Sequence, residues 1–335
     1  MPALAPAPMP ARILAALAVA LAAGTALAQE APSGTLTLYT SQPNEDAQAT
    51  VDAFEAAYPD VEVEFVRDGT TQIMAKLRAE IEAGNPQPDV LLIADTVTME
   101  GLSQEGLLMA HPDADTSAYD PALMDEGGEY FPTKLITTGI VYNTSATMVP
   151  TSYQDLLKPE AKGQIAMPSP LTSGAATIHM NALTGDPSLG WAYYEGLADQ
   201  DASPQGGNGG VYKAVAGGEK LYGFVVDFLP IREKAAGAPV EFVFPEEGVS
   251  AVTEPVAILS STDNPDAAKA FVDFLLSPEG QQLAADQGYL PAHPDIAPPE
   301  GFPPRGEIKL LEFDAAAALE NDAAQKMRFE EVFGG

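Results

Sequence analysis

The sequence predicts an α/β protein of two lobes, in which each lobe is a mostly parallel sheet flanked by helices. Strand and helix patterns alternate along the chain, which is typical of α/β folds. Residues 89–94 contain a continuous apolar run, as expected for a parallel strand that helices cover on both faces. A chain of 335 residues also exceeds the size of one ordinary core, which favours two lobes.

Period-two alternation of apolar residues predicts the strands, and helical spacing predicts the helices between them. The N-terminal part is expected to contain strands at residues 35–40, 61–65 and 89–94 and helices at residues 47–58 and 69–84. The later strands are expected at residues 136–142, 163–167, 222–226, 239–244 and 252–259. The later helices are expected to begin at Ser173 and to cover residues 188–197 and 265–276. This order predicts one discontinuous lobe, residues 29–134 plus 250–335, and a second lobe, residues 135–249.

The first 28 residues have the features of an export signal. Arg12 is followed by a short apolar run over residues 13–23, and Ala26-Leu27-Ala28 fits a cleavage site with small residues. The run is about half the roughly 20 residues that cross a bilayer, so we expect removal of the signal and no membrane anchor. The predicted location is the periplasm, with a mature chain that begins near Gln29.

The composition excludes several classes of function. The chain has 48 Asp and Glu residues against 16 Lys and Arg residues, whereas nucleic-acid binding needs a basic surface. We attribute the excess of acidic residues to a role in keeping the protein soluble. The absence of cysteine excludes cysteine catalysis, cysteine metal sites and N-terminal lipid attachment.

The sequence also lacks the common catalytic motifs, so we expect a binding protein without a cofactor or a metal. His111, His179 and His293 are scattered, and no HExxH or Gly-x-Ser-x-Gly motif is present. The glycines in residues 206–210 are not followed by the Lys-Ser/Thr of a nucleotide-binding loop. His179 lies on a predicted helix, and we expect it in the core.

The segment Thr172-Ser173-Gly174-Ala175 marks a candidate anion site at a predicted helix start. Hydroxyl groups and free backbone N–H groups there meet the positive end of the helix dipole, which favours an anion without a lysine or an arginine. An ordinary serine or threonine cap explains the same residues.

Five stretches resemble the solute-binding proteins of bacterial ABC transporters that bind ferric ion, phosphosugars or 2-aminoethylphosphonate (type II periplasmic binding proteins). They are residues 38–41, 139–144, 170–175, 208–219 and 264–281. The resemblance implies a chain that crosses twice between two lobes, a ligand in the cleft between them, and closure of the lobes over it. It also implies docking on an inner-membrane ABC permease, and we expect a monomer.

The resemblance implies roles for several residues. In ferric-binding relatives the segment matching Ser173, Gly174 and Ala175 holds a phosphate anion, and an Asn matching Asn208 donates to it. Further candidates at a strand end or a helix start are Thr40, Ser41, Thr70 and Thr172. Local turns or helix caps explain these residues equally well.

The same resemblance argues against iron. Iron-binding relatives carry adjacent tyrosines where this chain has Phe228 and Leu229, and their histidine has no counterpart in residues 42–45. Ferric ion needs charged oxygen ligands, so ferric-ion binding falls to second place among the possible functions. Tyr193 and Tyr194 lie in a predicted helix and are expected in the core.

Three carboxylates complete the expected site. Asp227 follows a buried strand, where a carboxylate needs a partner or a wet surface, and Asp95 and Glu254 stand at similar strand ends. For the last two, a capping or solvated carboxylate is an equal alternative. Neutral donors at one end and carboxylates at the other fit a zwitterion, so the predicted ligand is 2-aminoethylphosphonate. A hexose phosphate is the near alternative, ferric ion comes after it, and a periplasmic hydrolase is the alternative from another class.

Overall fold

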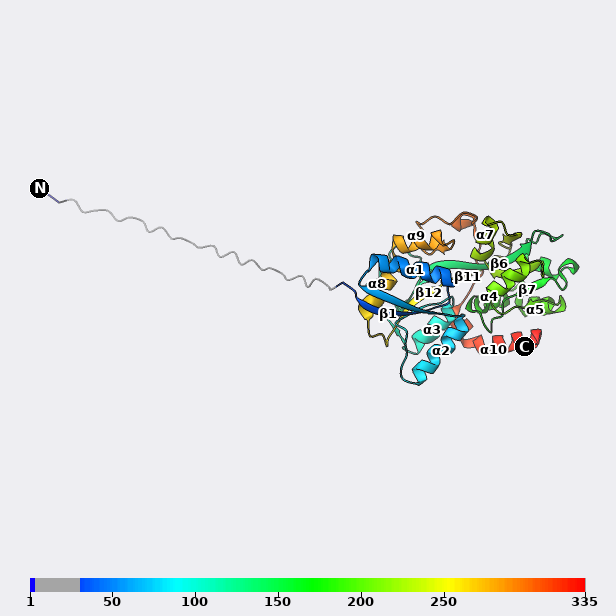
Figure 1. Ribbon diagram of the computed structural model, residues 1–335, viewed down its shortest axis with the longest axis horizontal. Coiled ribbons are helices and arrows are strands. Elements are labelled where there is room, and N and C mark those ends of the chain that lie inside the picture. Colours follow the sequence, from blue (N-terminus) through cyan, green and yellow to red (C-terminus); the bar gives the residue numbers. More distant parts are fainter. Residues whose placement is uncertain (4–30, 335) are drawn as a thin grey trace. The chain divides into compact units, whose positions relative to one another are not determined.

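The structure is a computed structural model that describes residues 1–3 and 31–334. From residue 4 on, the predicted export signal and its cleavage site lie outside the described residues. No helix in the described part of the chain is long and apolar enough to cross a membrane. Residues from Pro32 onward form one unit that contains two sheets, and each sheet is the centre of one lobe (Figure 1).

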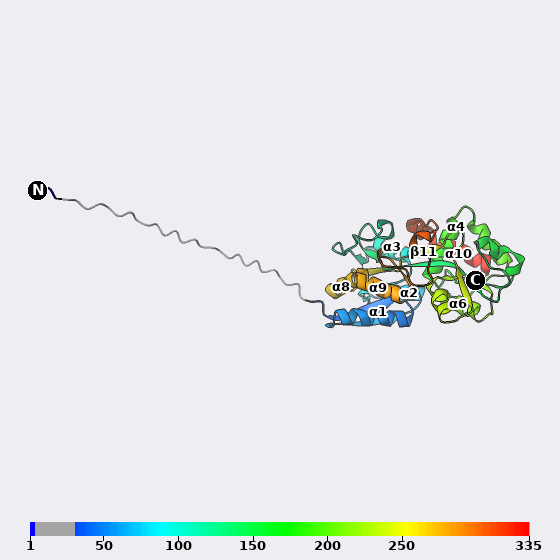
Figure 2. The same cartoon turned by 90° about the horizontal axis from the view of Figure 1, so that it is seen from above.

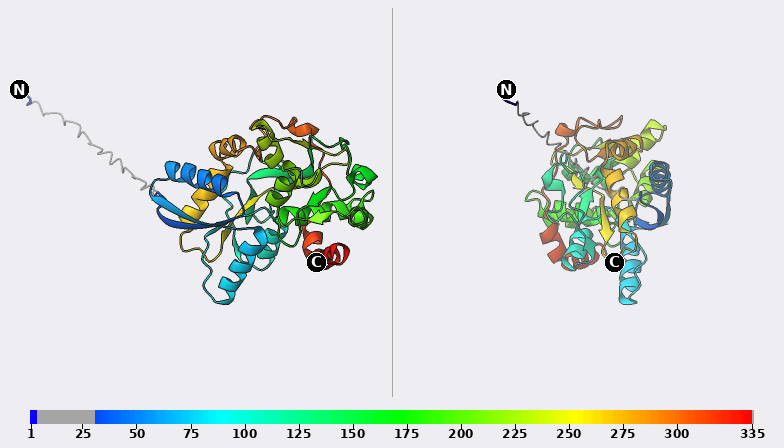
Figure 3. Two further views of the ribbon diagram at one scale, coloured as in Figure 1. Left: turned by 45° about the vertical axis from the view of Figure 1, so that its right-hand side comes forward. Right: turned by 90° about the vertical axis from the view of Figure 1, so that its left-hand side faces the viewer.

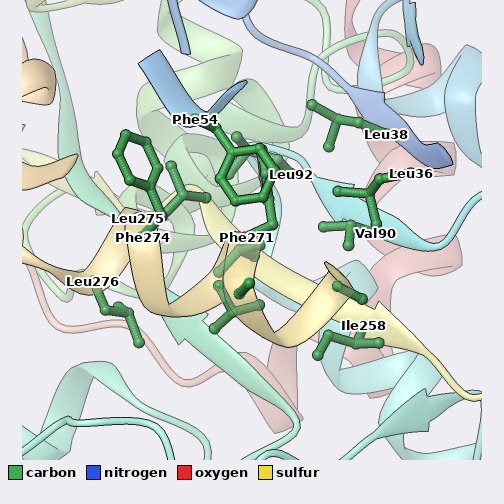
Figure 4. Close-up of a cluster of buried hydrophobic side chains, with 14 of the residues drawn as sticks. Leu36, Leu38, Phe54, Val90, Leu92, Ile258, Phe271, Phe274, Leu275 and Leu276 are labelled. Atoms are coloured by element: carbon green, nitrogen blue, oxygen red, sulfur yellow. The ribbon is translucent and has the colours of Figure 1, made fainter. Parts of the chain in front are cut away.

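The first sheet, which defines lobe 1, has the strand order β2-β1-β3-β12-β4, and β5 also pairs with β12. Its strands are β1 (Gly34–Thr40), β2 (Val61–Arg67), β3 (Val90–Leu92), β4 (Leu108–Met109), β5 (Tyr130–Pro132) and β12 (Pro255–Leu259). Its helices are α1 (Asn44–Ala57), α2 (Thr70–Glu82), α3 (Thr96–Gln104), α8 (Pro265–Leu276) and α9 (Pro278–Asp286). Figure 4 shows one of its cores, where the ring of Phe54 lies 4.9 Å from that of Phe271 and 5.7 Å from that of Phe274.

The second sheet, which defines lobe 2, has the order β10-β6-β9-β7-β8, and β11 and β13 also pair with β6. Its strands are β6 (Lys134–Asn143), β7 (Ile165–Met167), β8 (Ser203–Pro204), β9 (Tyr222–Val226), β10 (Val240–Val243), β11 (Ser250–Val252) and β13 (Leu290–Pro291). Its helices are α4 (Gly174–Gly185), α5 (Gly190–Asp199), α6 (Asn208–Ala216) and α7 (Phe228–Ala235). Figure 2 shows α4 and α6 at the opposite end of the unit from α1 and α8.

The α/β class with two helix-flanked sheets is confirmed, and one detail of the prediction is corrected. We expected mostly parallel sheets, but both sheets are mixed. In lobe 1, β1 is parallel to β2 and β3, whereas β12 is antiparallel to its neighbours. In lobe 2, β7 is parallel to β8 and β9, whereas β6 is antiparallel to its neighbours. The reason is that β6 and β12 are the strands by which the chain enters each sheet from the other lobe.

Two adjacent crossings join the lobes, as the resemblance implies. The chain passes from β5 to β6 through Thr133, and from β11 to β12 through Thr253 and Glu254. The N–H groups of Thr133 and Lys134 both donate to the carbonyl of Thr253, at 3.1 and 3.2 Å, which ties the crossings together. Glu254 has a positive φ of 39°, and this bend breaks the single strand predicted over residues 252–259.

The C-terminal part makes a further connection that sequence analysis missed. After α9 the chain returns to lobe 2, where β13 pairs with β6 and Leu310 pairs with Val249 in parallel. The last helix, α10 (Ala315–Phe333), then packs against α3 of lobe 1 and against α5 of lobe 2. Its Phe329 ring lies 6.2 Å from the ring of Tyr194. Figure 3 shows this helix in red at the C-terminus. The residues after 250 therefore contact both lobes.

Candidate functional site

The lobe 1 side of the candidate site is the edge at which β1 and β3 end. Because the strands are parallel and Thr40 pairs with Leu92, the residues that follow both strands lie side by side. The Ser41 Oγ accepts the N–H of Ala94 at 2.9 Å. Thr40 is fully buried, and its Oγ1 accepts the N–H of Gln42 at 3.1 Å. This hydrogen bond stabilises the conformation of the loop.

The lobe 2 side is formed by the N-terminus of α4, which begins where it was predicted, and by the N-terminus of α6, which was not predicted. Ser173 caps α4, and its Oγ accepts the N–H of Ala176 at 3.4 Å. The same oxygen accepts from Nδ2 of Asn208, the first residue of α6, at 3.2 Å. The Asn208 Oδ1 accepts the N–H of Val226 at 3.1 Å, which fixes the orientation of the amide. Thus two predicted residues that are 35 positions apart meet.

This network leaves donors without acceptors at the start of α4. Both lone pairs of the Ser173 hydroxyl receive hydrogen bonds, so its proton remains for donation. The Asn208 Nδ2 group uses one of its two hydrogens for Ser173, so the second hydrogen is also available for donation. The N–H groups of Gly174 and Ala175 belong to the first turn, where an α-helix offers no internal acceptor. Donors and the positive helix end together create a site for a negatively charged group.

The two sides of the site touch each other. A Cβ atom built on Gly174 would lie 2.5 Å from the carbonyl oxygen of Ala94 and 2.7 Å from the Cβ of Asp95. One built on Gly69, which precedes α2, would lie 3.3 Å from the carbonyl oxygen of Thr172. Only glycine permits the approach at position 174. The start of α4 therefore abuts lobe 1 beside Ser41 and Asp95.

The other neutral residues predicted for the site are buried or already hydrogen-bonded. Thr70 begins α2 and is buried, and α2 has no side-chain cap. The Thr172 Oγ1 donates to the carbonyl of Ser169 at 3.4 Å, so its proton is already used. Ala175 is buried in the first turn of α4 and offers only its backbone N–H.

Asp95 and Asp227 are both N-caps with protein partners. Asp95 caps α3 and accepts from the N–H of Thr98 at 3.2 Å and from the hydroxyl of Thr98, and burial raises its pKa. Asp227 caps α7 and is 1% exposed. It accepts the N–H and the hydroxyl of Thr137, at 2.9 and 2.6 Å, and the N–H of Phe228 at 2.7 Å. Burial outweighs these hydrogen bonds and raises the pKa of Asp227 to about 7.

Glu254 is paired with a cation that sequence analysis missed. The Lys134 Nζ lies 2.6 Å from its Oε2, and the two side chains are 4% and 3% exposed. The Gln42 Nε2 donates to the same oxygen at 3.3 Å, and Nζ lies 4.0 Å from the centre of the Tyr289 ring. A lysine at the start of an otherwise apolar strand was the available signal in the sequence. The charge of Glu254 is therefore balanced inside the protein.

The residues weighed for iron lie in packed surroundings. Phe228 is buried, with its ring 4.4 Å from that of Tyr289, and Tyr193 and Tyr194 belong to the core of lobe 2. His179 is also in that core, where its Nδ1 lies 2.9 Å from the Ser250 Oγ and burial lowers its pKa to about 3. Among the residues that the structure describes, no three acidic or histidine side chains are grouped to hold a metal ion.

Comparisons with known proteins identify relatives along most of the chain. Residues 49–308 match the model of the family described as bacterial extracellular solute-binding protein. An uncharacterized protein of Haemophilus influenzae is 29% identical over 323 residues, covering 88% of this chain and 89% of its own. A probable ABC transporter periplasmic-binding protein of Sinorhizobium fredii is 26% identical, covering 91% and 88%. The solved structure of the periplasmic binding protein AfuA from Actinobacillus pleuropneumoniae, with exogenous fructose-6-phosphate bound, has a TM-score of 0.81 and 25% identity, covering 90% and 99%.

Proposed function

The chain belongs to the bacterial extracellular solute-binding proteins, and we propose that it captures a small organic phosphate or phosphonate between its lobes and delivers it to an ABC permease. The observation that carries this proposal is the set of donors without acceptors at the start of α4. Ser173, Asn208 and the N–H groups of Gly174 and Ala175 lie together at the start of α4. A group that accepts several hydrogen bonds and bears negative charge fits such a set.

The strong negative charge of the protein does not prevent this binding. The net charge of −32 repels an anion at long range, but salt screens such repulsion beyond about 8 Å at physiological ionic strength. At contact, each hydrogen bond to a charged group contributes about 1.5–3 kcal/mol. Several donors at one site therefore outweigh the screened repulsion.

The other end of the ligand is better explained by hydroxyl groups than by an ammonium group. The carboxylates of Asp95, Asp227 and Glu254 already accept hydrogen bonds or an ion pair from the protein. An ammonium group would have to displace those partners, whereas sugar hydroxyls both donate and accept. The bound fructose-6-phosphate of the relative AfuA also supports a sugar phosphate. We therefore rank a hexose phosphate above 2-aminoethylphosphonate, which the sequence alone had favoured.

A panel of probes tests the proposal. Thermal shift and calorimetry on the purified protein compare fructose 6-phosphate, fructose, 2-aminoethylphosphonate, inorganic phosphate and Fe³⁺. A probe present at a hundred times its dissociation constant should add about 2.7 kcal/mol to the free energy of unfolding. We expect this gain from the sugar phosphate and none from fructose. Equal binding of fructose would refute the anion site, and a coloured, stoichiometric iron complex would establish the iron alternative.

A second measurement separates binding from catalysis. Long incubation with the bound phosphorylated compound should return it unchanged, because no nucleophile with a base partner was found in the sequence. Sustained release of inorganic phosphate would instead identify a hydrolase.

A further inference from the structure

Arg67, the last residue of β2, is held by backbone carbonyl groups. Its Nε donates to the carbonyl of Gln42 at 2.7 Å, and its Nη2 lies 3.5 Å from the carbonyl oxygen of Ser41. Both bonds use the same side edge of the guanidinium group. The outer edge consists of the Nη1 hydrogens and the second Nη2 hydrogen, which remain available for donation. Arg67 is also exposed.

In the part of the chain that the structure describes, Arg67 differs from three other arginines in forming no ion pair. Arg78, Arg232 and Arg328 each form an ion pair with an acidic side chain. Within residues 31–334, no acidic group forms an ion pair with Arg67, although the chain contains 48 such residues. An arginine fork that carbonyl groups hold in place, with one edge free, matches the geometry of a phosphate or carboxylate.

The sheet register puts this free cation beside the candidate site. In lobe 1, Thr40 pairs with Arg67 on one side and with Leu92 on the other, so all three strands end in one row. The row continues into the Ser41 loop and into Ala94, against which Gly174 of lobe 2 packs. Two residues after Arg67, Gly69 packs against the carbonyl of Thr172 in lobe 2. Arg67 thus lies on the rim of lobe 1 where the start of α4 meets it.

We propose that Arg67 is a specificity-determining residue that contacts the phosphate from lobe 1 while α4 and α6 hold it from lobe 2. This inference rests on the proposed function, and it replaces the expectation of a site without lysine or arginine. The two carbonyl bonds hold the guanidinium group in position, so little side-chain freedom is lost when the anion arrives. An anion bound from both lobes favours their contact, because a ligand shifts an equilibrium toward the state that it binds better.

The test compares variants in calorimetry with fructose 6-phosphate as the probe. Arg67→Gln removes the charge and should weaken binding roughly ten- to a hundredfold, as expected for a hydrogen-bonded charge. Arg67→Lys keeps the charge without the fork and should lose less. The matched control is Lys269→Gln in α8, which changes the net charge equally and should leave the dissociation constant within about twofold.

Salt dependence separates a direct contact from a merely structural role. An exposed ion pair weakens with salt, so raising NaCl from 0.05 to 0.5 M should weaken the wild type more than Arg67→Gln, whereas Ser173→Ala should keep the wild-type salt dependence. Unchanged affinity of Arg67→Gln alongside weakened Ser173→Ala would overturn the role of Arg67 and leave the proposed function intact. Equal salt dependence of the wild type and Arg67→Gln would also overturn it. Failure of the wild type to bind any phosphorylated probe would overturn both.

Discussion

Substitution of one glycine tests whether contact between the lobes is part of ligand capture. In Gly174→Ala, the added Cβ would lie 2.5 Å from the carbonyl oxygen of Ala94 and 2.7 Å from the Cβ of Asp95, atoms that belong to lobe 1. Backbone atoms cannot yield as a flexible side chain would, so the lobes must separate by several tenths of an ångström. Overpacking of this kind costs about 1–3 kcal/mol, which corresponds to a roughly 5- to 150-fold loss of affinity.

The control lies at the other end of the same helix. Gly185 is the last residue of α4, and a Cβ built on it meets no atom within 4 Å. Gly185→Ala should therefore keep the ligand affinity and leave the protein as stable as the wild type or slightly more stable, because alanine is the better helix former. Calorimetry gives the dissociation constants, and small-angle scattering with and without the phosphorylated probe reports the closure. If Gly174→Ala binds and closes like Gly185→Ala, the contact between the lobes has no part in capture.

Three further predictions concern buried charges and the N-terminus. Because the pKa of Asp227 in the folded protein is about 7, above that of an unfolded aspartate, its contribution to stability is present near pH 4 and is lost as the pH rises through 7. In Asp227→Asn, denaturant unfolding should lose this part of the pH dependence, and an unaltered pH profile would contradict the raised pKa. Lys134→Met leaves Glu254 buried without its cation and should lower the free energy of unfolding by about 3–5 kcal/mol. The double variant Lys134→Met with Glu254→Gln should restore most of this loss. Equal losses of stability in the single and double variants would exclude this ion pair as the cause. N-terminal sequencing of the exported protein should start near Gln29, and a start at Met1 would disprove cleavage of the predicted signal.

The local structure could be predicted from the sequence wherever periodicity was strong. The helix that begins at Ser173 and the buried strand at residues 222–226 occur as predicted, because apolar spacing and a helix cap specify them locally. The two-residue strands β4, β8 and β13 could not be found, since two residues carry no period. The return of the chain to lobe 2 begins at β13 and continues through a proline-rich segment, residues 291–304, which has no pattern to reveal it.

The partners of the charged residues could not be predicted, because they come from distant parts of the chain. Thr137, which donates to Asp227, is 90 positions away from it, and Lys134 and Glu254 belong to different crossings between the lobes. The sequence correctly indicated that a carboxylate at these strand ends needs a partner. It could not show that the partner is the protein itself. A ligand role for these carboxylates stays a prediction, and the internal bonds make it less favourable.

The contacts between the lobes explain how the proposed anion would be held selectively by an acidic protein. Lobe 2 supplies neutral donors whose orientation is fixed by Asn208 and the cap of α4, so the donors do not depend on the net charge. Lobe 1 supplies the surface against which α4 packs, and Arg67 stands at its rim with one free edge. In the proposed complex, an anion would gain its full set of hydrogen bonds only when Gly174 of lobe 2 reaches Ala94 of lobe 1. Because binding and contact between the lobes are coupled in this way, a compound without an anionic group would leave the donors of α4 unsatisfied and would favour the contact only weakly.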